Sequence, residues 1–276
     1  MKIALCNEVL SGMEFAAQCA FAAEIGFDGL EVAPFTLGDE PHLLPASKRA
    51  EIRRAATDAG IVVTGLHWLL VTPKGLSLNG PDDAVRDRTA DVMERLVGLC
   101  ADLGGTVLVH GSPQQRSVPE GGDASAARRR AVAALTRAGR AAEAADVTYC
   151  LEPLSRRETN FINTVAEAAD LIDEVGSSRV RTMIDTSAAG QTEDIPVADL
   201  IEKWIPTGKV AHIQVNDTNR RGPGEGDNRF APIFRSILRS GYPGVIAVEP
   251  FVYRPDGPAT AARSIGYIRG ILEAVG

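Results

Sequence analysis

The sequence has few cysteines and few histidines, the side chains that build most zinc sites. It contains four of each among 276 residues. The cysteines are scattered inside apolar segments, without the spacing of a zinc site or a redox pair: Cys6, Cys19, Cys100 and Cys150. We therefore expect all four to be small core residues, which favours a reducing compartment.

The chain also lacks an excess of positive charge and any long hydrophobic run. Its net charge is −7 and its isoelectric point is near 5.2, so a nucleic acid or an anionic membrane would be repelled. Asn7 and Glu8 interrupt the apolar N-terminus before a secretory signal could form, and no later apolar run has the length of a membrane span. We expect a soluble, cytoplasmic protein without nucleic-acid or membrane partners.

Two further absences concern the organisation of the chain. No linker, low-complexity tract or internal repeat interrupts it, so we expect a single domain over residues 1–276. The first turn from a strand to a helix, CNEVLSGME, lacks the G-x-G-x-x-G pattern that cradles a dinucleotide phosphate. This absence disfavours a nucleotide-binding, doubly wound sheet.

The chain does contain a regular alternation of β-rich runs and amphipathic helical segments, several of which end in glycine. The strand candidates are residues 2–6, 28–33, 61–67, 106–111, 147–152, 180–185, 210–215 and 245–249. The helical candidates are residues 13–26, 47–60, 83–105, 124–146, 165–176, 197–204, 230–242 and 261–276. Repeated strand-helix units imply parallel pairing with right-handed crossovers, and eight of them close a sheet into a barrel. The predicted fold is an α/β (β/α)8 TIM barrel, with an open doubly wound sheet as the alternative.

Ionisable or amide side chains stand at the carboxyl ends of four consecutive strand candidates: Glu152, Asp185, Gln214 and Glu249. In a TIM barrel these strand ends ring the mouth where chemistry occurs, and the alternation of side chains points the carboxylates into the lumen. Carboxylates that converge there would repel one another unless a cation neutralises them. Any one of them could instead cap a helix or pair with an arginine. Oxygen ligands without thiolate favour Mg²⁺ or Mn²⁺ over a structural zinc.

Over nearly its whole length the chain resembles the xylose-isomerase-like TIM barrels of the sugar isomerase and epimerase superfamily, most closely the D-tagatose 3-epimerase type. The matching segments are GFDGLEV (26–32), LEPL with Asn160 after it (151–160), MIDTS (183–187), NDTNRRGPGEGD (216–227) and GYPGVIAVEPF (241–251). The resemblance implies one divalent metal ion held by Glu152, Asp185, Glu249 and a residue of strand seven, with the two glutamates as acid and base.

In that family the ligand on strand seven is a histidine. It stands six residues before the first arginine of an Asn-Arg-Arg run. Counting back from Arg220 assigns this position to Gln214 and leaves His212 deeper in the lumen, as a hydrogen-bonded core residue or a substrate contact. A glutamine also occurs there in enzymes that resemble hydroxypyruvate isomerase. Because an amide oxygen is a weaker ligand than imidazole for transition metals, we expect Mn²⁺ or Mg²⁺, with Co²⁺ as a further option.

The resemblance also implies substrate contacts at Glu158 and Arg220. Strand ends and the loops after them add His67, Trp68, His110 and Arg116 as candidates for the substrate pocket. The family's usual histidine three residues after the strand-six aspartate is replaced by Ala188, which leaves the sugar open. Loops 68–81 and 111–123, rich in glycine, proline and serine, are expected to be lids over the mouth.

We therefore expect a metal-dependent ketose epimerase or isomerase that removes a proton next to a carbonyl and works through an enediolate. Related barrels suggest three alternatives: a 3-oxo-glycoside lyase, a C-glycoside-deglycosylating enzyme with a partner subunit, and a hydroxypyruvate isomerase. A zinc-dependent abasic-site DNA endonuclease would need more histidines than this chain has, and a non-catalytic sugar-binding role is the last alternative. We expect a homo-oligomer, either a dimer or a tetramer.

Overall fold

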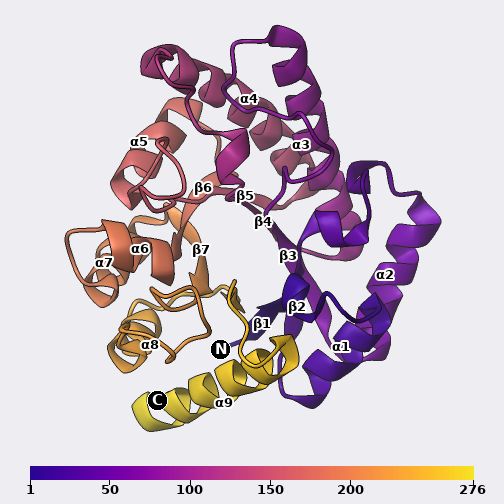
Figure 1. Cartoon of the computed structure of the whole chain (residues 1–276), viewed down its shortest axis with the longest axis vertical. Helices are drawn as coiled ribbons and strands as arrows, with labels where there is room; N and C mark the ends of the chain where they lie inside the picture. Colours follow the sequence, from indigo (N-terminus) through magenta and orange to yellow (C-terminus); the bar gives the residue numbers. More distant parts are fainter.

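The computed structural model describes residues 1–276 and shows a closed barrel of parallel strands in which β1 pairs with both β2 and β8. Figure 1 shows the strands as an inner ring and the helices around it. The strands are β1 (Ile3–Cys6), β2 (Gly29–Val32), β3 (Val62–His67), β4 (Val107–His110), β5 (Thr148–Leu151), β6 (Val180–Asp185), β7 (Val210–Val215) and β8 (Ile246–Val248). The predicted TIM barrel is confirmed, with every strand where the sequence indicated one.

Helices cover the outside of the barrel, and most lie where the sequence predicted them. They are α1 (Phe15–Glu24), α2 (Ala46–Asp58), α3 (Asp83–Leu103), α4 (Ala124–Ala145), α5 (Val165–Val175), α6 (Thr186–Thr192), α7 (Val197–Trp204), α8 (Phe230–Arg239) and α9 (Gly257–Val275). Short 3-10 turns follow several strands, among them Asn7–Leu10 and Pro34–Leu37. The short helix α6 was not predicted, and it begins directly at the end of β6.

Local sequence signals explain where the longer helices begin and end. The side chains of Asp82 and Asp123 accept hydrogen bonds from the first backbone N–H groups of α3 and α4. Thr164 and Glu167 form a capping box at the start of α5. Gly104 ends α3 in the left-handed region, at φ 89°, where a residue with a Cβ would be strained.

Two hydrophobic layers hold the barrel together. The larger contains 57 buried residues and includes the outward side chains of the strands, such as Leu108, Leu151 and Ile213, packed against the helices. Inside the lumen lies a separate, smaller cluster of Val107, Val109, Cys150 and Met183. Cys150 is two residues before Glu152, and Met183 is two residues before Asp185, so alternation directs both carboxylates into the lumen above this cluster.

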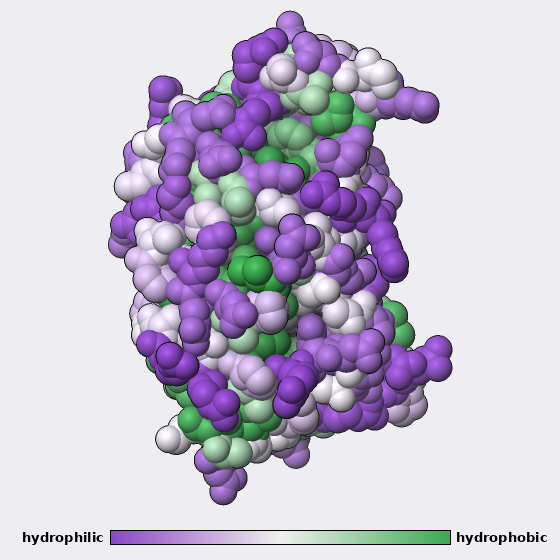
Figure 2. Space-filling view, turned by 90° about the vertical axis from the view of Figure 1, so that its left-hand side faces the viewer, coloured by the Kyte–Doolittle hydropathy of each residue, from purple (hydrophilic) through white to green (hydrophobic).

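The face of the molecule drawn in Figure 2 is mostly hydrophilic. Figure 2 shows one side of the molecule, on which hydrophilic residues predominate and hydrophobic ones appear between them in narrow strips. This distribution is typical of amphipathic helices that turn their apolar stripe to a sheet. None of the helices has the length and apolar character required to cross a membrane.

The loops after β3, β4 and β5 are tied to one another at the mouth of the barrel. Leu70 N–H donates to Ser112 Oγ at 3.0 Å, and Leu78 N–H donates to the carbonyl of Gln115 at 2.7 Å. On the other side, the side chain of Asn160 exchanges two hydrogen bonds with the backbone of Val118. The two predicted lid loops thus form a continuous wall, and their movement stays a prediction.

Candidate active site

Three carboxylates meet at the carboxyl ends of the strands. Glu152 directly follows β5, Asp185 ends β6 and Glu249 directly follows β8. Ligand oxygens of the three lie within 4.8 Å of one another, and each residue is no more than 5% exposed. The structure therefore brings together the three acids that the sequence singled out.

The fourth predicted ligand, Gln214, stands on the neighbouring strand β7. Gln214 is the register partner of Asp185 on β6 and of Ala247 on β8, so it lies between the strands that carry two of the acids. Its Nε2 donates to Glu31 Oε1 at 2.7 Å, and its Oε1 is buried without a hydrogen-bond partner. The amide of Gln214 is therefore held by its Nε2, while its Oε1 has no hydrogen bond and could accept one or bind a cation.

Asp185 has the same division between its two oxygens. Oδ1 accepts a hydrogen bond from Ala188 N–H at 2.7 Å and caps helix α6, whereas Oδ2 is buried without a partner. Helix capping therefore accounts for the contacts of Oδ1 but not for the burial of Oδ2. Free, buried acceptors on Asp185 and Gln214, next to two further carboxylates, fit a hard divalent cation that takes oxygen ligands.

Burial and mutual repulsion control the ionisation of the acids. Burial, with the charges of Glu249 and Asp185, raises the pKa of Glu152 well above its usual range. Burial and the charge of Glu249 do the same to the pKa of Asp185. Burial raises the pKa of Glu249 to about 7, although its contact with His67 works in the opposite direction. A cation among these groups would favour their ionised forms.

His67 lies behind Glu249 and connects it to a fourth acid. Its Nδ1 is 2.9 Å from Glu249 Oε1, and its Nε2 is 3.0 Å from Glu8 Oε2, with all three residues buried. His67 does not line the pocket described below, so the structure places it as a support for Glu249. Its predicted contact with substrate stays a prediction.

His212 lies deeper in the lumen than Gln214, as its position two residues earlier on β7 predicted. Its Nε2 is 2.8 Å from Glu31 Oε2, and both residues are buried. Burial is the largest influence on the pKa of Glu31 and works to raise it, but His212, His67 and the hydrogen bond from Gln214 together outweigh burial, so the net shift is downward. His212 is thus a buried residue beside Glu31, the acid that accepts a hydrogen bond from Gln214, and its contact with Glu31 lacks hydrogen-bond geometry.

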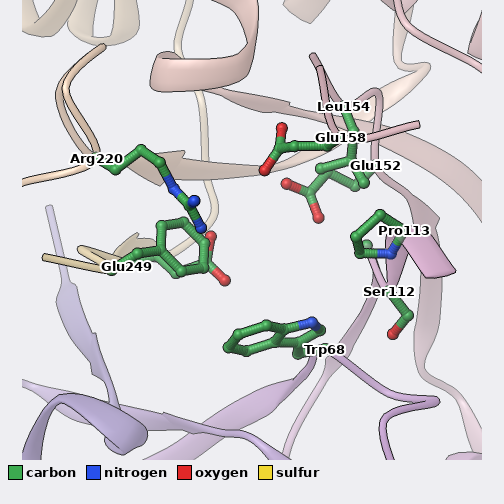
Figure 3. Close-up of a pocket in the computed structure, with 10 residues that line it drawn as sticks. Trp68, Ser112, Pro113, Glu152, Leu154, Glu158, Arg220 and Glu249 are labelled. Atoms are coloured by element: carbon green, nitrogen blue, oxygen red, sulfur yellow. The ribbon is translucent and has the colours of Figure 1, made fainter. Parts of the chain in front are cut away.

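A pocket opens above the acid cluster, and the empty space in it, including its opening to solvent, is about 380 Å³. In Figure 3, Glu152 and Glu158 point into it from one side, Arg220 and Glu249 approach from the other, and Trp68 lies across its floor in this view. The residues that line it are Trp68, Gly111, Ser112, Pro113, Glu152, Leu154, Glu158, Arg220, Glu249 and Phe251. Five of them were predicted as site residues: Trp68, Glu152, Glu158, Arg220 and Glu249.

Aromatic rings form one wall of this pocket. The Trp68 ring packs edge-on against Phe35 and Phe251, with centroids 5.4 and 5.6 Å apart, and the Arg220 guanidinium lies 4.6 Å from the Phe251 ring centroid. Trp68 and Arg220 both adopt left-handed backbone conformations, at φ 53° and 66°. Such conformations are costly for these residues and gather at functional sites.

His110 and Arg116 lie behind the pocket wall and do not line the pocket. His110 Nδ1 is 2.8 Å from the hydroxyl of Tyr149, and its Nε2 is buried without a partner. Arg116 is completely buried. Burial and the charge of Arg116 lower the pKa of His110 to about 3, so the imidazole is neutral. Contact of either residue with a substrate stays a prediction.

Of the other lining residues, Gly111, Ser112 and Pro113 lie in the loop 111–123 that the sequence predicted over the mouth, and Leu154 and Phe251 were not predicted, although both carried a signal. Leu154 stands two residues after Glu152, and Phe251 stands two residues after Glu249. An extended chain returns to the same side every second residue, so the chain that leaves each ligand could have pointed to them. Gly111, Ser112 and Pro113 follow β4 in a turn whose conformation the local sequence does not predict.

The comparisons with known proteins agree on one family. Residues 19–271 match the family model described as xylose isomerase-like TIM barrel. The chain is 30% identical over 83% of its length to 74% of a D-psicose 3-epimerase from Enterocloster bolteae. It is 26% identical to a 3-dehydro-D-guloside 4-epimerase from Escherichia coli, over 98% of this chain and 99% of that one. A crystal structure of a D-psicose 3-epimerase, obtained with D-fructose, superposes over the whole of both chains with a TM-score of 0.83 at 23% identity.

Proposed function

We propose that this chain epimerises or isomerises a keto sugar by moving a carbon-bound proton. The chain belongs to the xylose isomerase-like TIM barrel family and is an enzyme of the epimerase type. The single observation that carries the proposal is the convergence of Glu152, Asp185 and Glu249, two of which, Glu152 and Glu249, line a pocket. Two relatives act on keto sugars by name, a D-psicose 3-epimerase and a 3-dehydro-D-guloside 4-epimerase.

A divalent cation fits the residues at this site. Glu152, Asp185, Gln214 and Glu249 would hold it, and their oxygen donors, with one neutral amide, favour Mn²⁺ or Mg²⁺. Such a cation acts as a Lewis acid on a substrate's carbonyl and hydroxyl oxygens and so makes the neighbouring C–H bond more acidic. We propose no further cofactor.

The two glutamates are placed to exchange a proton with the substrate. In Figure 3 they enter the pocket from different sides, so a sugar carbon between them would face both. One carboxylate takes the proton from carbon, and the other, in its protonated form, returns a proton to the opposite face or to the adjacent carbon. His67 holds Glu249 through Oε1, which leaves Oε2 of that carboxylate for other contacts.

Further residues would hold the substrate. Glu158 lines the pocket with its Oε2 fixed by Ser155, which donates from N–H at 3.1 Å and from Oγ at 2.7 Å. Arg220 is fixed by its backbone carbonyl, which accepts from Phe251 and Val252 at 2.8 and 2.9 Å. A fixed acceptor and a fixed donor suit the hydroxyl groups of a sugar, and Trp68 offers a ring face for its apolar side.

The experiment that tests the proposal is proton exchange in deuterium oxide with Mn²⁺, screened across ketoses. We expect an isomer or epimer that carries deuterium at the carbon that loses its proton, and no exchange with Glu152→Gln. If no keto sugar exchanges a carbon-bound proton in the presence of metal, the proposal is wrong.

A second candidate substrate is a 3-oxo-glycoside. The observation that favours it is the match to the 3-dehydro-D-guloside 4-epimerase, which covers 99% of that protein compared with 74% of the D-psicose 3-epimerase. The same proton abstraction would then allow either epimerisation or elimination of the aglycone. Deuterium in the recovered glycoside indicates epimerisation, and release of the aglycone indicates a lyase or a C-glycoside-deglycosylating enzyme. A hydroxypyruvate isomerase would convert the three-carbon substrate alone.

We also propose a cytoplasmic location and a homo-oligomer. Four buried cysteines without disulfides support a reducing compartment. Light scattering of the purified protein measures the oligomeric state directly.

A further inference from the structure

A second, polar pocket lies at the mouth of the barrel. The empty space in it, including its opening to solvent, is about 840 Å³. We call it the side pocket, and the residues that line it are Ser155, Arg156, Arg157, Gln191, Thr192 and Thr218. They follow β5, β6 and β7, which are neighbours in the barrel. The side pocket is therefore at the same end of the strands as the acid cluster.

The side pocket is adjacent to the pocket that Glu152 and Glu249 line. After β5, Leu154 lines that first pocket and the next residue, Ser155, lines the side pocket. After β7, Thr218 lines the side pocket and Arg220 lines the first pocket. A hydrogen bond joins the two, because Ser155 Oγ donates at 2.7 Å to Oε2 of Glu158, which lines the first pocket.

Helix α6 connects the acid cluster with the side pocket. Thr192 stands seven residues after Asp185, about two helical turns, and so lies on the same face of the helix. The residues between them on this face are Ala188 and Ala189, whose side chains are only methyl groups. No large side chain of α6 therefore stands between the acids and the side pocket.

The end of α6 is also fixed in place. Gln191 Nε2 donates to the carbonyl and to Oγ of Ser187, both at 3.1 Å. A Cβ at Gly190 would lie 3.0 Å from Thr218 Cγ2, so the helix packs closely against the loop after β7. Two walls of the side pocket are therefore held together by contacts of the fold.

Two arginines give the side pocket a positive charge. The one ion pair that either of them makes is a long contact, with 3.9 Å between Arg156 Nη2 and Glu167 Oε1. Arg157 has no carboxylate partner, and both arginines are exposed. On a chain with a net charge of −7, a pair of cations at the mouth is a local departure from the charge of the whole protein.

The chemistry of the lining favours an anion over a second sugar ring. The first pocket offers the rings of Trp68 and Phe251, on which the apolar side of a sugar can lie. The side pocket has no apolar or aromatic side chain, only hydroxyl, amide and guanidinium groups. Guanidinium groups bind phosphate and carboxylate through charge-assisted hydrogen bonds, which hydroxyl groups can supplement.

We propose that the side pocket binds an anionic group, a phosphate or a carboxylate, at one end of the keto sugar. This inference rests on the proposed function and names the substrate class as an acidic keto sugar. The carbonyl of the substrate lies in the first pocket, and its anionic end passes Ser155 and Glu158 to reach Arg156 and Arg157. The negative charge of the substrate is thereby kept with the arginines and apart from the acid cluster.

The test measures ligand binding to the Mn²⁺-loaded protein by titration calorimetry. The probes are D-fructose, D-fructose 1-phosphate and D-fructose 6-phosphate, with D-fructuronate as the carboxylate. We expect at least one of the three anionic sugars to bind about tenfold or more tightly than D-fructose. The anionic sugar that binds most tightly then shows whether the side pocket takes phosphate or carboxylate. This preference should decrease in about 0.5 M NaCl, because salt screens exposed charges.

The double variant Arg156→Met/Arg157→Met shows whether the preference comes from the side pocket. It should bind D-fructose as the wild type does and should bind the anionic sugars no more tightly than D-fructose. Arg54→Met is the matched control, because Arg54 is an exposed arginine on α2 that lines neither pocket. The control should keep the full preference.

Two results would overturn the role of the side pocket. One is equal affinity of the wild type for D-fructose and all three anionic sugars. The other is a preference that remains in the double variant, since the anionic group would then bind elsewhere, for instance at the cation. Binding is measured without turnover, so a protein that prefers the anionic sugar but exchanges no carbon-bound proton would instead overturn the proposed function.

Discussion

Buried carboxylates in two halves of the lumen have opposite environments. Glu31, on β2, is 0% exposed; its Oε1 accepts a hydrogen bond from Gln214, and its Oε2 lies 2.8 Å from His212 Nε2. Glu152 and Asp185, from β5 and β6, are almost as deeply buried, but their nearest ionisable neighbours include other acids. Although burial opposes ionisation in both halves, the net pKa shift is downward for Glu31 and upward for the other two.

The contrast separates a structural acid from one that is prepared for a ligand. The negative charge of Glu31 is balanced by neighbouring protein groups. Glu31 also orients Gln214, which is a candidate metal ligand. Glu152, Asp185 and Glu249 are compensated only in part, and Glu249 belongs to both halves, since His67 partners one of its oxygens. Burial alone therefore does not identify a functional acid, whereas burial without compensation does.

The largest effect is expected from removing one uncompensated acid. Glu152→Gln preserves the shape of the side chain but cannot accept a proton, so proton exchange should slow by about 10³-fold. The measurement is deuterium incorporation into the substrate at saturating Mn²⁺, with the circular dichroism spectrum as a check on folding. A rate within tenfold of the wild type would mean that Glu152 is not the acid or base.

The pH dependence of stability sharpens the comparison in the metal-free protein. The pKa of Glu249 rises from 4.5 to about 7 in the fold, so the folded state holds a proton that the unfolded chain has lost. Stability should therefore decrease as the pH rises from about 4.5 through 7, by about 3 kcal/mol for this group. Urea unfolding after metal removal, at pH 5 and pH 8, checks this.

Glu249→Gln is the matched control for the pH dependence. It removes the titrating group, so its stability should decrease less over the same pH range. Saturating Mn²⁺ should reverse the trend in the wild type, since a cation binds the ionised carboxylates. The same slope in both metal-free proteins would contradict the assignment to Glu249.

A smaller effect is expected from removing the compensated acid. Glu31→Gln leaves His212 without its carboxylate and allows the amide of Gln214 to turn, so we expect a loss of about 2 kcal/mol in unfolding free energy. Mn²⁺ affinity should decrease about tenfold, as is usual when a residue that orients a ligand is lost. Urea unfolding and titration calorimetry measure the two effects, and unchanged Mn²⁺ affinity would argue against the orienting role.

The smallest effect on activity is expected from exchanging the neutral ligand. Gln214→His places an imidazole where the amide oxygen stands, and nitrogen ligands favour later transition metals over Mg²⁺. We expect the ratio of Co²⁺ to Mg²⁺ affinity to rise about tenfold, with the rate of proton exchange changed by less than that. An unchanged ratio would indicate that residue 214 does not contact the cation.

The sequence predicted the strands closely because most of them are apolar runs that follow a helix end and stop at a polar residue. It missed α6, since the segment Thr186–Thr192 is short, contains a glycine and shows no helical periodicity. The three acids were predictable because an ionisable residue that ends an apolar barrel strand faces the mouth. Alternation gives the direction of such a side chain.

The alternation of side chains along a strand does not predict whether a residue at or beyond the strand end reaches the pocket. His110 ends β4 as Asp185 ends β6, and Arg116 lies in the loop after β4, yet neither lines the pocket. Trp68 and Arg220 have left-handed backbones and contact Phe35 and Phe251, which are distant from them in the sequence. Tertiary packing, which no local pattern encodes, decides which of these residues reach the pocket.

The most direct test of the account is titration of the metal-free protein with Mn²⁺, in the wild type and in Asp185→Asn. Asp185 is chosen because it lies in the acid cluster but does not line the pocket. The account predicts one Mn²⁺ per chain in the wild type and an affinity at least about 100-fold lower in Asp185→Asn. The absence of saturable binding in the wild type, or equal affinity in the two proteins, would contradict a cation shared by Glu152, Asp185, Gln214 and Glu249.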